Sequence, residues 1–193
     1  VFENRVKVEE KVVREDGKEL IVLLSLYPDI DRSGNLNGFD GYILNITERK
    51  KAEENIRLAA KVMESTLEGI FITDGEFNIT AVNPSFKDIT GLSYEEVKGR
   101  NPAIMAAGNY DIETYRQISG AIKTGTAWQG EIKNRRKNGE AYLAWLNISA
   151  IKDNDGKITN YVGVFTDITQ RKLIEDHLNF RANYDILTEL PNR

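Results

Sequence analysis

Side chains that could carry out acid–base or metal chemistry are few and poorly grouped in this sequence. Its 193 residues contain no cysteine and a single histidine, His177, so disulfides, thiol catalysis and cysteine-ligated zinc are excluded. Two acidic groups remain, Glu95-Glu96 and Asp153-Asn154-Asp155. The first fits a capping box that begins at Ser93, and the second fits a hairpin turn that ends at Gly156. Neither has a convergent set of partner residues, so we predict no catalytic residue and no metal site.

The overall composition is that of a soluble globular protein. Hydrophobic residues make up 40% of the chain, charged residues make up 29%, and the formal net charge is -4. Because there is no basic excess, we expect no binding to nucleic acid or to an anionic membrane surface. The longest apolar runs, such as Leu20–Leu24, are much too short to cross a bilayer. With no signal peptide in the sequence, we expect a cytoplasmic location.

An internal repeat organises the chain. Arg14-Glu15-Asp16-Gly17 aligns with Arg136-Lys137-Asn138-Gly139, which is an offset of 122 residues (139 minus 17). At the same offset, Ile46-Thr47 aligns with Ile168-Thr169 without a gap. Each copy predicts three antiparallel strands joined by polar turns, followed by a helix that begins near the threonine. The chain therefore holds the same structural ending twice.

The first copy lacks the half that precedes the second. Residues 1–46 predict three strands alone, and three strands are stable only when their apolar face is covered. We expect this cover to come from sequence outside the chain, from a helix or from a second chain. The second copy is complete, because Gly69–Asp74 and Asn78–Val82 predict a hairpin, Asn83-Pro84 opens a run of short helices, and Asp111–Lys123 predicts an amphipathic helix.

This order of elements, together with several short motifs, closely resembles the PAS fold. The motifs are Asn83-Pro84-Ser85-Phe86, Thr90-Gly91-Leu92-Ser93, Trp128-Gln129-Gly130-Glu131, Asn134-Arg135-Arg136-Lys137-Asn138-Gly139 and Gly163-Val164-Phe165-Thr166-Asp167-Ile168-Thr169. The resemblance implies an α+β fold with a five-stranded antiparallel sheet and helices on one face. It divides the chain into the end of an upstream PAS domain (1–46), a linker helix (47–66), a complete PAS domain (67–169), an output linker helix (170–187) and the start of a further domain (184–193).

That further domain is indicated by the last ten residues. Tyr184–Arg193 resembles the opening of a diguanylate cyclase (GGDEF) domain, a class of domain that makes cyclic di-GMP from GTP. The resemblance implies a sensory and dimerisation module that regulates a C-terminal cyclase. The metal-binding carboxylates and the signature loop of such a cyclase are absent from this sequence, so we expect the chain itself not to be an enzyme.

The ligands that a PAS pocket could hold are limited by missing residue types. Light-sensing relatives carry a cysteine after a Gly-Arg-Asn motif, but here Pro102 follows Asn101, so a covalent flavin adduct is not expected. Histidine-ligated haem is not expected either, because His177 lies in the downstream helix. Non-covalent FAD stays open, since the stretch from Trp128 to Asn134 resembles redox-sensing PAS domains that bind FAD.

In that interpretation Trp128 could stack on the flavin ring and Asn134 could hydrogen-bond to its polar edge. Asn101 and Trp145 are further candidate ligand contacts. The alternative is that both tryptophans serve packing or an interface and that Asn134 lies on the surface. The cofactor is therefore unknown, and FAD, another small ligand and a packed pocket without ligand all stay open.

The joint between sheet and output helix is the predicted signal-coupling element. The resemblance implies that Asp167-Ile168-Thr169 transmits sheet movement to the helix. Thr169 can cap the helix, and Asp167 places a carboxylate near its positive end, within reach of Arg171 or Lys172. The first copy has Asn45 in place of the aspartate, so we expect signalling through that joint to be altered.

The linker helices predict a homodimer. Ala52, Ile56, Ala59, Met63 and Thr66 follow the 4-3-4-3 spacing of a coiled-coil seam. The alternative is that these helices pack on their own sheets. For the whole chain, the alternative function is a PAS module that binds other proteins and no small ligand.

Overall fold

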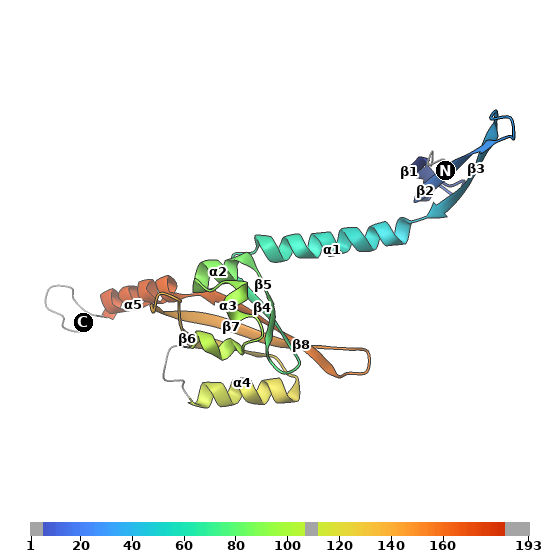
Figure 1. Cartoon of the computed structure of the whole chain (residues 1–193). Coiled ribbons are helices and arrows are strands. Elements are labelled where there is room, and N and C mark those ends of the chain that lie inside the picture. The colour runs from blue at the N-terminus through green and yellow to red at the C-terminus, as the bar shows by residue number, and fades with distance from the viewer. Residues whose placement is uncertain (1–5, 107–111, 184–193) are drawn as a thin grey trace. The chain divides into compact units, whose positions relative to one another are not determined.

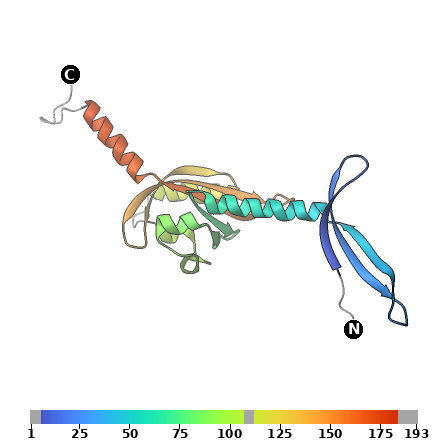
Figure 2. The ribbon, with the colours of Figure 1, turned by 90° about the horizontal axis from the view of Figure 1, so that it is seen from above.

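The computed structural model describes residues 6–106 and 112–183, and the chain divides into two compact units, Val1–Val62 and Met63–Arg193. The first unit is a three-stranded antiparallel sheet in the order β1-β2-β3, followed by a helix (Figure 2). Its elements are β1 (Val6–Val13), β2 (Glu19–Ile30), β3 (Leu36–Asn45) and α1 (Thr47–Ser65), the last of which runs into the second unit. No helix within the described ranges is long and apolar enough to cross a membrane.

The second unit is built around a five-stranded antiparallel sheet in the order β5-β4-β8-β7-β6. Its strands are β4 (Gly69–Asp74), β5 (Ile79–Val82), β6 (Trp128–Arg135), β7 (Ala141–Lys152) and β8 (Ile158–Asp167). Its helices are α2 (Pro84–Thr90), α3 (Tyr94–Val97), the 3-10 helix η1 (Pro102–Met105), α4 (Ile112–Thr124) and α5 (Thr169–Asn183). Helices α3, η1 and α4 lie over one face of the sheet, whereas α5 continues from β8 and projects beyond it (Figure 1). The predicted α+β PAS fold is confirmed.

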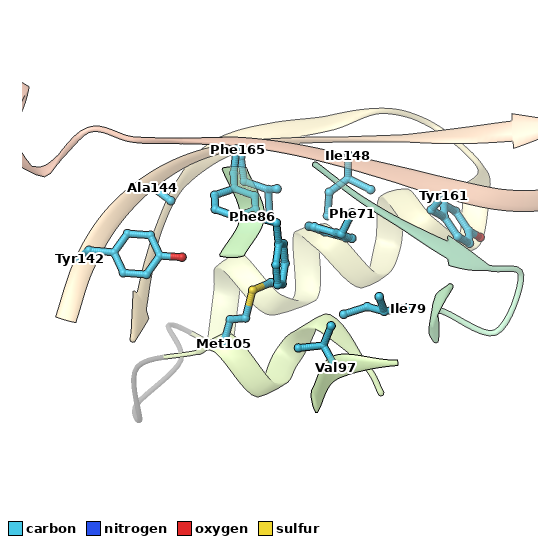
Figure 3. Close-up of a cluster of buried hydrophobic side chains, with 11 residues drawn as sticks. Phe71, Ile79, Phe86, Val97, Met105, Tyr142, Ala144, Ile148, Tyr161 and Phe165 are labelled. Carbon is cyan, nitrogen blue, oxygen red and sulfur yellow. The ribbon is translucent and has the colours of Figure 1, made fainter. Parts of the chain in front are cut away.

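The core of the second unit lies between the sheet and these helices (Figure 3). Phe71, Phe86 and Phe165 are almost fully buried, and the rings of Phe86 and Phe165 meet edge to face with centroids 5.8 Å apart. Gly163 is required on β8 because the ring of Phe71 lies over it, and a Cβ there would come within 2.1 Å of that ring. Burial of these large aromatic side chains gives the sheet its fixed inner face.

The acidic groups singled out in the sequence have structural roles. Ser93 and Glu96 form the predicted capping box at the start of α3. Hydrogen bonds from Lys137 and from Ser93 lower the pKa of Glu96 to about 2, so this carboxylate is fixed in its ionised form. Asp153 accepts backbone hydrogen bonds from Asp155 and Lys157 inside the β7–β8 turn. Glu96 and Asp153 therefore both stabilise local backbone structure.

The sequence repeat is also a repeat of strand register. The pair Val6↔Leu26 in β1–β2 corresponds to Trp128↔Ile148 in β6–β7, and Val22↔Asn45 in β2–β3 corresponds to Ala144↔Asp167 in β7–β8. Each residue of these pairs is shifted by 122 (128 minus 6, 167 minus 45). A one-residue slip would turn every side chain to the other face, so the shared register means that equivalent residues point to equivalent faces.

Candidate functional site

A cavity of about 530 Å³ lies between the sheet and the helices of the second unit. This volume falls within the range of about 300–1,000 Å³ that small-molecule sites usually have. Its walls are mainly apolar. They are formed by Phe71, Phe77, Pro102, Ala103, Met105, Ile118, Ile132, Leu143, Leu146, Ile148 and Phe165, with Asn101, Thr114, Glu131, Lys133 and Asn134 as the polar members.

Asn134 is the buried polar residue of this cavity. It lies on β6, where alternate residues point inward, and its side chain is only 5% exposed. Its Nδ2 donates to the phenolic oxygen of Tyr142 at 3.3 Å. Burial raises the pKa of Tyr142 above its usual value, so the phenol stays protonated. The amide of Asn134 is therefore held at the cavity wall, where a ligand could also reach it.

Asn101, another predicted ligand contact, also lines the cavity, and it is the N-cap residue of η1. Its Oδ1 accepts a hydrogen bond from the backbone N–H of Ala103 at 2.9 Å. Pro102 is part of the same wall.

The structure does not bring the two tryptophans to the cavity wall. The ring of Trp128 lies over Gly130, where a Cβ would come within 2.8 Å of it, and packs at the margin of the core. Trp145 is 42% exposed, because Ala144 and Leu146 on either side of it in β7 point into the core and turn Trp145 to the outer face. Of the four candidate contacts, only Asn134 and Asn101 therefore come together.

The joint at Asp167 and Thr169 is held by a compact set of hydrogen bonds. Oδ1 of Asp167 accepts from the backbone N–H of Thr169 at 2.9 Å, and Oγ1 of Thr169 accepts from the backbone N–H of Leu143 at 3.0 Å. The backbone N–H of Ile168 donates to the carbonyl of Leu143 at 2.9 Å. The first residue of α5 is thus fixed to β7, which lies next to β8 in the sheet.

Asp167 forms its ion pair with Arg136, rather than with Arg171 or Lys172 as the sequence suggested. Arg136 lies in the β6–β7 turn, which folds back against the end of β8 and which sequence distance could not reveal. Burial opposes ionisation of Asp167, but the hydrogen bonds from Thr169 and Arg136 outweigh it and keep its pKa below the usual value.

Arg136 connects more than one element. Its guanidinium also donates to the carbonyl of Ile89 near the end of α2, and it lies over the ring of Tyr142 with 4.5 Å between the guanidinium carbon and the ring centroid. A continuous set of contacts therefore runs from the cavity to α5. Its members in order are Asn134, Tyr142, Arg136, Asp167 and Thr169.

A second contact holds the first turns of α5. Nζ of Lys172 lies 2.8 Å from a carboxylate oxygen of Glu131 on β6, and this pairing raises the pKa of Lys172. Arg171, the third predicted coupling residue, is exposed on α5. Sequence reasoning missed Tyr142, Arg136 and Glu131. The alternation of β7 could have indicated an inward Tyr142, but the two ion pairs depend on strand pairing.

A family profile described as a PAS domain matches residues 67–170, which is more than half of the chain. The chain belongs to the PAS domain family. Among curated proteins, this PAS chain is 26% identical over 117 residues to the nitrogen fixation regulatory protein of Klebsiella pneumoniae, covering 61% of the chain and 24% of that protein. It is 28% identical over 138 residues to the blue-light-activated histidine kinase of Rhizobium johnstonii, covering 70% of the chain and 40% of that protein.

Solved structures agree on the fold. The PAS domain of a Colwellia psychrerythraea protein aligns with a TM-score of 0.54 at 24% identity, covering 61% of this chain and 99% of that one. The chain spans less than half the length of both curated relatives described above. The activity of a whole protein containing this PAS domain is therefore a matter for proposal.

Proposed function

We propose that this chain is a sensory input module in which a small ligand in the PAS cavity changes the position of α5, and thereby controls a C-terminal diguanylate cyclase. The observation that supports this most is the set of contacts from cavity-lining Asn134 to the start of α5. The cyclase output rests on the resemblance of residues 184–193, which lie outside the described residues. The module itself carries out no catalysis in this proposal, and we place it in the cytoplasm.

A hydrogen-bond acceptor on the ligand would compete with the hydroxyl oxygen of Tyr142 for the hydrogen bond that Nδ2 of Asn134 donates. Tyr142 carries the guanidinium of Arg136 on its ring, so a shift of this ring moves the partner of Asp167. Because Asp167 and Thr169 fix the first turn of α5, the shift reaches the output helix as a rotation or a loosening of that turn. In this proposal α5 turns about the hydrogen bond from the backbone N–H of Leu143 to Oγ1 of Thr169, which stays in place.

The linker helices supply the dimer contact in this proposal. Ile56 of α1 is 72% exposed. Ile174 and Leu178 of α5 are also largely exposed, and because they are four residues apart they lie on the same face of that helix. Apolar side chains at coiled-coil spacing are stabilised when a second helix covers them. Rotation of α5 would then align or separate two cyclases.

Non-covalent FAD fits part of this cavity. Asn134 could hydrogen-bond to the polar edge of a flavin ring, and Phe71 and Phe165 offer apolar surface to its faces. A bound flavin would supply redox sensitivity. Trp128 and Trp145 do not contribute to this fit, because neither lines the cavity.

The experiment that tests the proposal is mass spectrometry of small molecules released from the natively purified chain. It is combined with absorbance spectra after reconstitution with FAD. A bound small molecule, lost or weakened at least about ten-fold in Asn134→Val, supports the ligand-sensing function. In the full-length protein, Asp167→Ala should leave cyclase activity present but insensitive to the ligand. Absence of any ligand, together with unchanged regulation in Asp167→Ala, would contradict the proposal.

A second candidate is a PAS module that binds another protein and no small ligand. The exposed Trp145 and Ile151 on the outer face of β7 favour it, because large apolar side chains are enriched in protein interfaces. Trp145→Ala should then abolish partner binding while leaving any cavity ligand bound.

A further inference from the structure

Five turns in the described residues share one backbone geometry. In each turn the carbonyl of the first residue accepts from the N–H three residues later, and its own N–H donates to the carbonyl four residues later, at 2.8 to 3.1 Å. The first and fourth residues of these turns are Arg14 and Gly17, Asp31 and Gly34, Asp74 and Phe77, Arg136 and Gly139, and Asp153 and Gly156. The fourth residue has a positive φ throughout, between 68° and 90°.

Phe77 is the exception in this set. Four of the turns have glycine at the fourth position, which is the residue that adopts positive φ without steric cost. Phe77, with φ of 68°, is the single non-glycine residue with positive φ in the part of the chain that the structure describes. A bulky side chain is disfavoured in this left-handed region. The β4–β5 turn therefore keeps a strained residue where glycine would serve the backbone better.

The side chain of Phe77 has contacts that explain why it is kept. It meets the ring of Tyr161 edge to face, with centroids 5.3 Å apart, and it lines the cavity together with Asn101 and Pro102. Tyr161 is fixed in turn, because its hydroxyl donates to the carbonyl of Ile122 in α4 at 2.8 Å. By contrast, a Cβ on Gly17, Gly34, Gly139 or Gly156 would meet open space.

These contacts give the cavity two chemically different ends. Tyr161 and Tyr142 lie at opposite ends of the buried cluster (Figure 3). Asn134 donates to Tyr142 and makes that end polar, whereas Phe77, which packs against Tyr161, makes an aromatic wall at the other. Strained residues persist where surrounding structure holds them and where their position serves a function.

We propose that Phe77 is a specificity-determining residue, which closes the hairpin end of the cavity and sets the length of ligand that fits between itself and Asn134. The ligand class is a flat aromatic molecule with a hydrogen-bonding group at one end. The polar group faces Asn134, and the aromatic end faces Phe77, which Tyr161 supports through its ring contact. This inference rests on the proposed function only in taking the cavity as the ligand site.

The test uses the whole chain and three probes of increasing length, benzoate, biphenyl-4-carboxylate and p-terphenyl-4-carboxylate. Their affinities are measured by calorimetry for wild type, Phe77→Gly and Phe77→Trp. Phe77→Gly suits the turn and opens the wall, so the preference for terphenyl over biphenyl should rise about ten-fold or more. Phe77→Trp should shift the preference in the opposite direction, towards the shorter acids.

Gly156→Phe is the matched control, because it places phenylalanine at the same turn position in open space. It should lower the melting temperature through backbone strain and leave the probe preference unchanged. An unchanged preference in both Phe77 variants, or no binding of any probe to Phe77→Gly, overturns the proposal. Mass spectrometry of the native protein tests the proposed function separately, since a missing natural ligand would leave the probe preferences as they are.

Discussion

The two copies of the strand–strand–strand–helix ending share several contacts at their joints and differ in an ion pair. In both, the threonine that begins the helix accepts a hydrogen bond from the middle strand, Ile21 to Thr47 at 2.9 Å and Leu143 to Thr169 at 3.0 Å. Lysine on the helix pairs with glutamate on the first strand in both, Lys50 with Glu9 and Lys172 with Glu131.

In the second copy, an ion pair connects the β6–β7 turn to the joint between β8 and α5. Arg136 binds Asp167, whereas in the first copy Asn45 replaces the aspartate and Arg14 pairs with Asp16 inside its own turn. Asn45 still accepts from the N–H of Thr47 at 3.0 Å, so the cap survives. The helix start can thus be held without the charge, and the charge adds a link from the helix to the β6–β7 turn and α2. We infer that this link, rather than the cap, carries the coupling.

The copies also differ in what covers their inner faces. Phe165 of β8 is 1% exposed, whereas Ile43, its equivalent in β3, is 68% exposed. Phe165→Ala should therefore destabilise the second unit by about 3–5 kcal/mol, because it leaves a cavity in a packed core. Ile43→Ala should cost less than about 0.5 kcal/mol in the same chain. Urea unfolding measures both, with tryptophan fluorescence for the second unit, which holds Trp128 and Trp145, and circular dichroism for the first.

A large cost for Ile43→Ala would contradict the exposed face and would mean that a partner covers it in solution. Repeating that measurement over a range of protein concentrations identifies a second copy as the partner, since its contribution grows with concentration.

Asp167→Asn makes the second joint resemble the first. Asp167 and Arg136 are each about a quarter exposed, so we expect a loss of about 1–2 kcal/mol at neutral pH. The folded pKa of Asp167 is lowered, so its stabilisation is present above the unfolded pKa of about 3.9 and disappears as the pH falls through the folded pKa. Urea midpoints of wild type and variant should therefore converge on acidification. Asp16→Asn, which changes the exposed pair with Arg14, is the control. A difference in urea midpoint between wild type and Asp167→Asn that stays constant with pH would contradict the role of the Asp167 charge.

Tyr142→Phe removes the hydrogen bond to Asn134 and keeps the ring under Arg136. The free energy of unfolding should fall by about 0.5–1.5 kcal/mol. The equivalent position in the first copy is Leu20, whose side chain cannot form such a hydrogen bond. Urea unfolding gives the loss. NMR of the Arg136 side-chain N–H should show that this signal no longer responds to a cavity ligand. Tyr161→Phe, which loses its bond to Ile122, should cost a similar amount while the Arg136 signal keeps its response.

Asn45→Asp gives the first copy the aspartate that the second copy has at Asp167. It offers Arg14 a second carboxylate at the position that Asp167 occupies for Arg136. Because Arg14 is exposed, the gain should be below about 1 kcal/mol and should shrink with added salt. Hydrogen exchange of the Thr47 amide measures it, and slower exchange at low salt is the expected result. Faster exchange would show that the two joints are not equivalent.

Lys50→Met and Lys172→Met break the contact that the copies share. Both pairs lie at the surface, so each variant should lower the melting temperature by less than about 2 °C, and by similar amounts. Calorimetric melts at low and high salt measure this. A much larger effect for Lys172→Met would show that this pair, and not Arg136 with Asp167, dominates the joint.

Local sequence alone determined much of this protein. Strand alternation, turn glycines and helix caps predicted the order of elements, since these signals act over a few residues. The offset of 122 predicted a repeated ending, and the structure shows the same register in both copies. Asn134 and Asn101 were predicted as ligand contacts, and they do lie at the cavity.

Tertiary structure decided which distant residues meet. Arg136 reaches Asp167 because strand pairing brings residues 31 positions apart to one corner, and sequence proximity favoured Arg171 and Lys172 instead. Trp145 faces outward because the register of β7 sets its face, and its residue type gave no such signal. Phe77 occupies the turn position that holds glycine in the four other turns of the same geometry, and only the structure shows that its ring contacts Tyr161 and lines the cavity. Local rules fix elements, whereas packing between elements fixes the site.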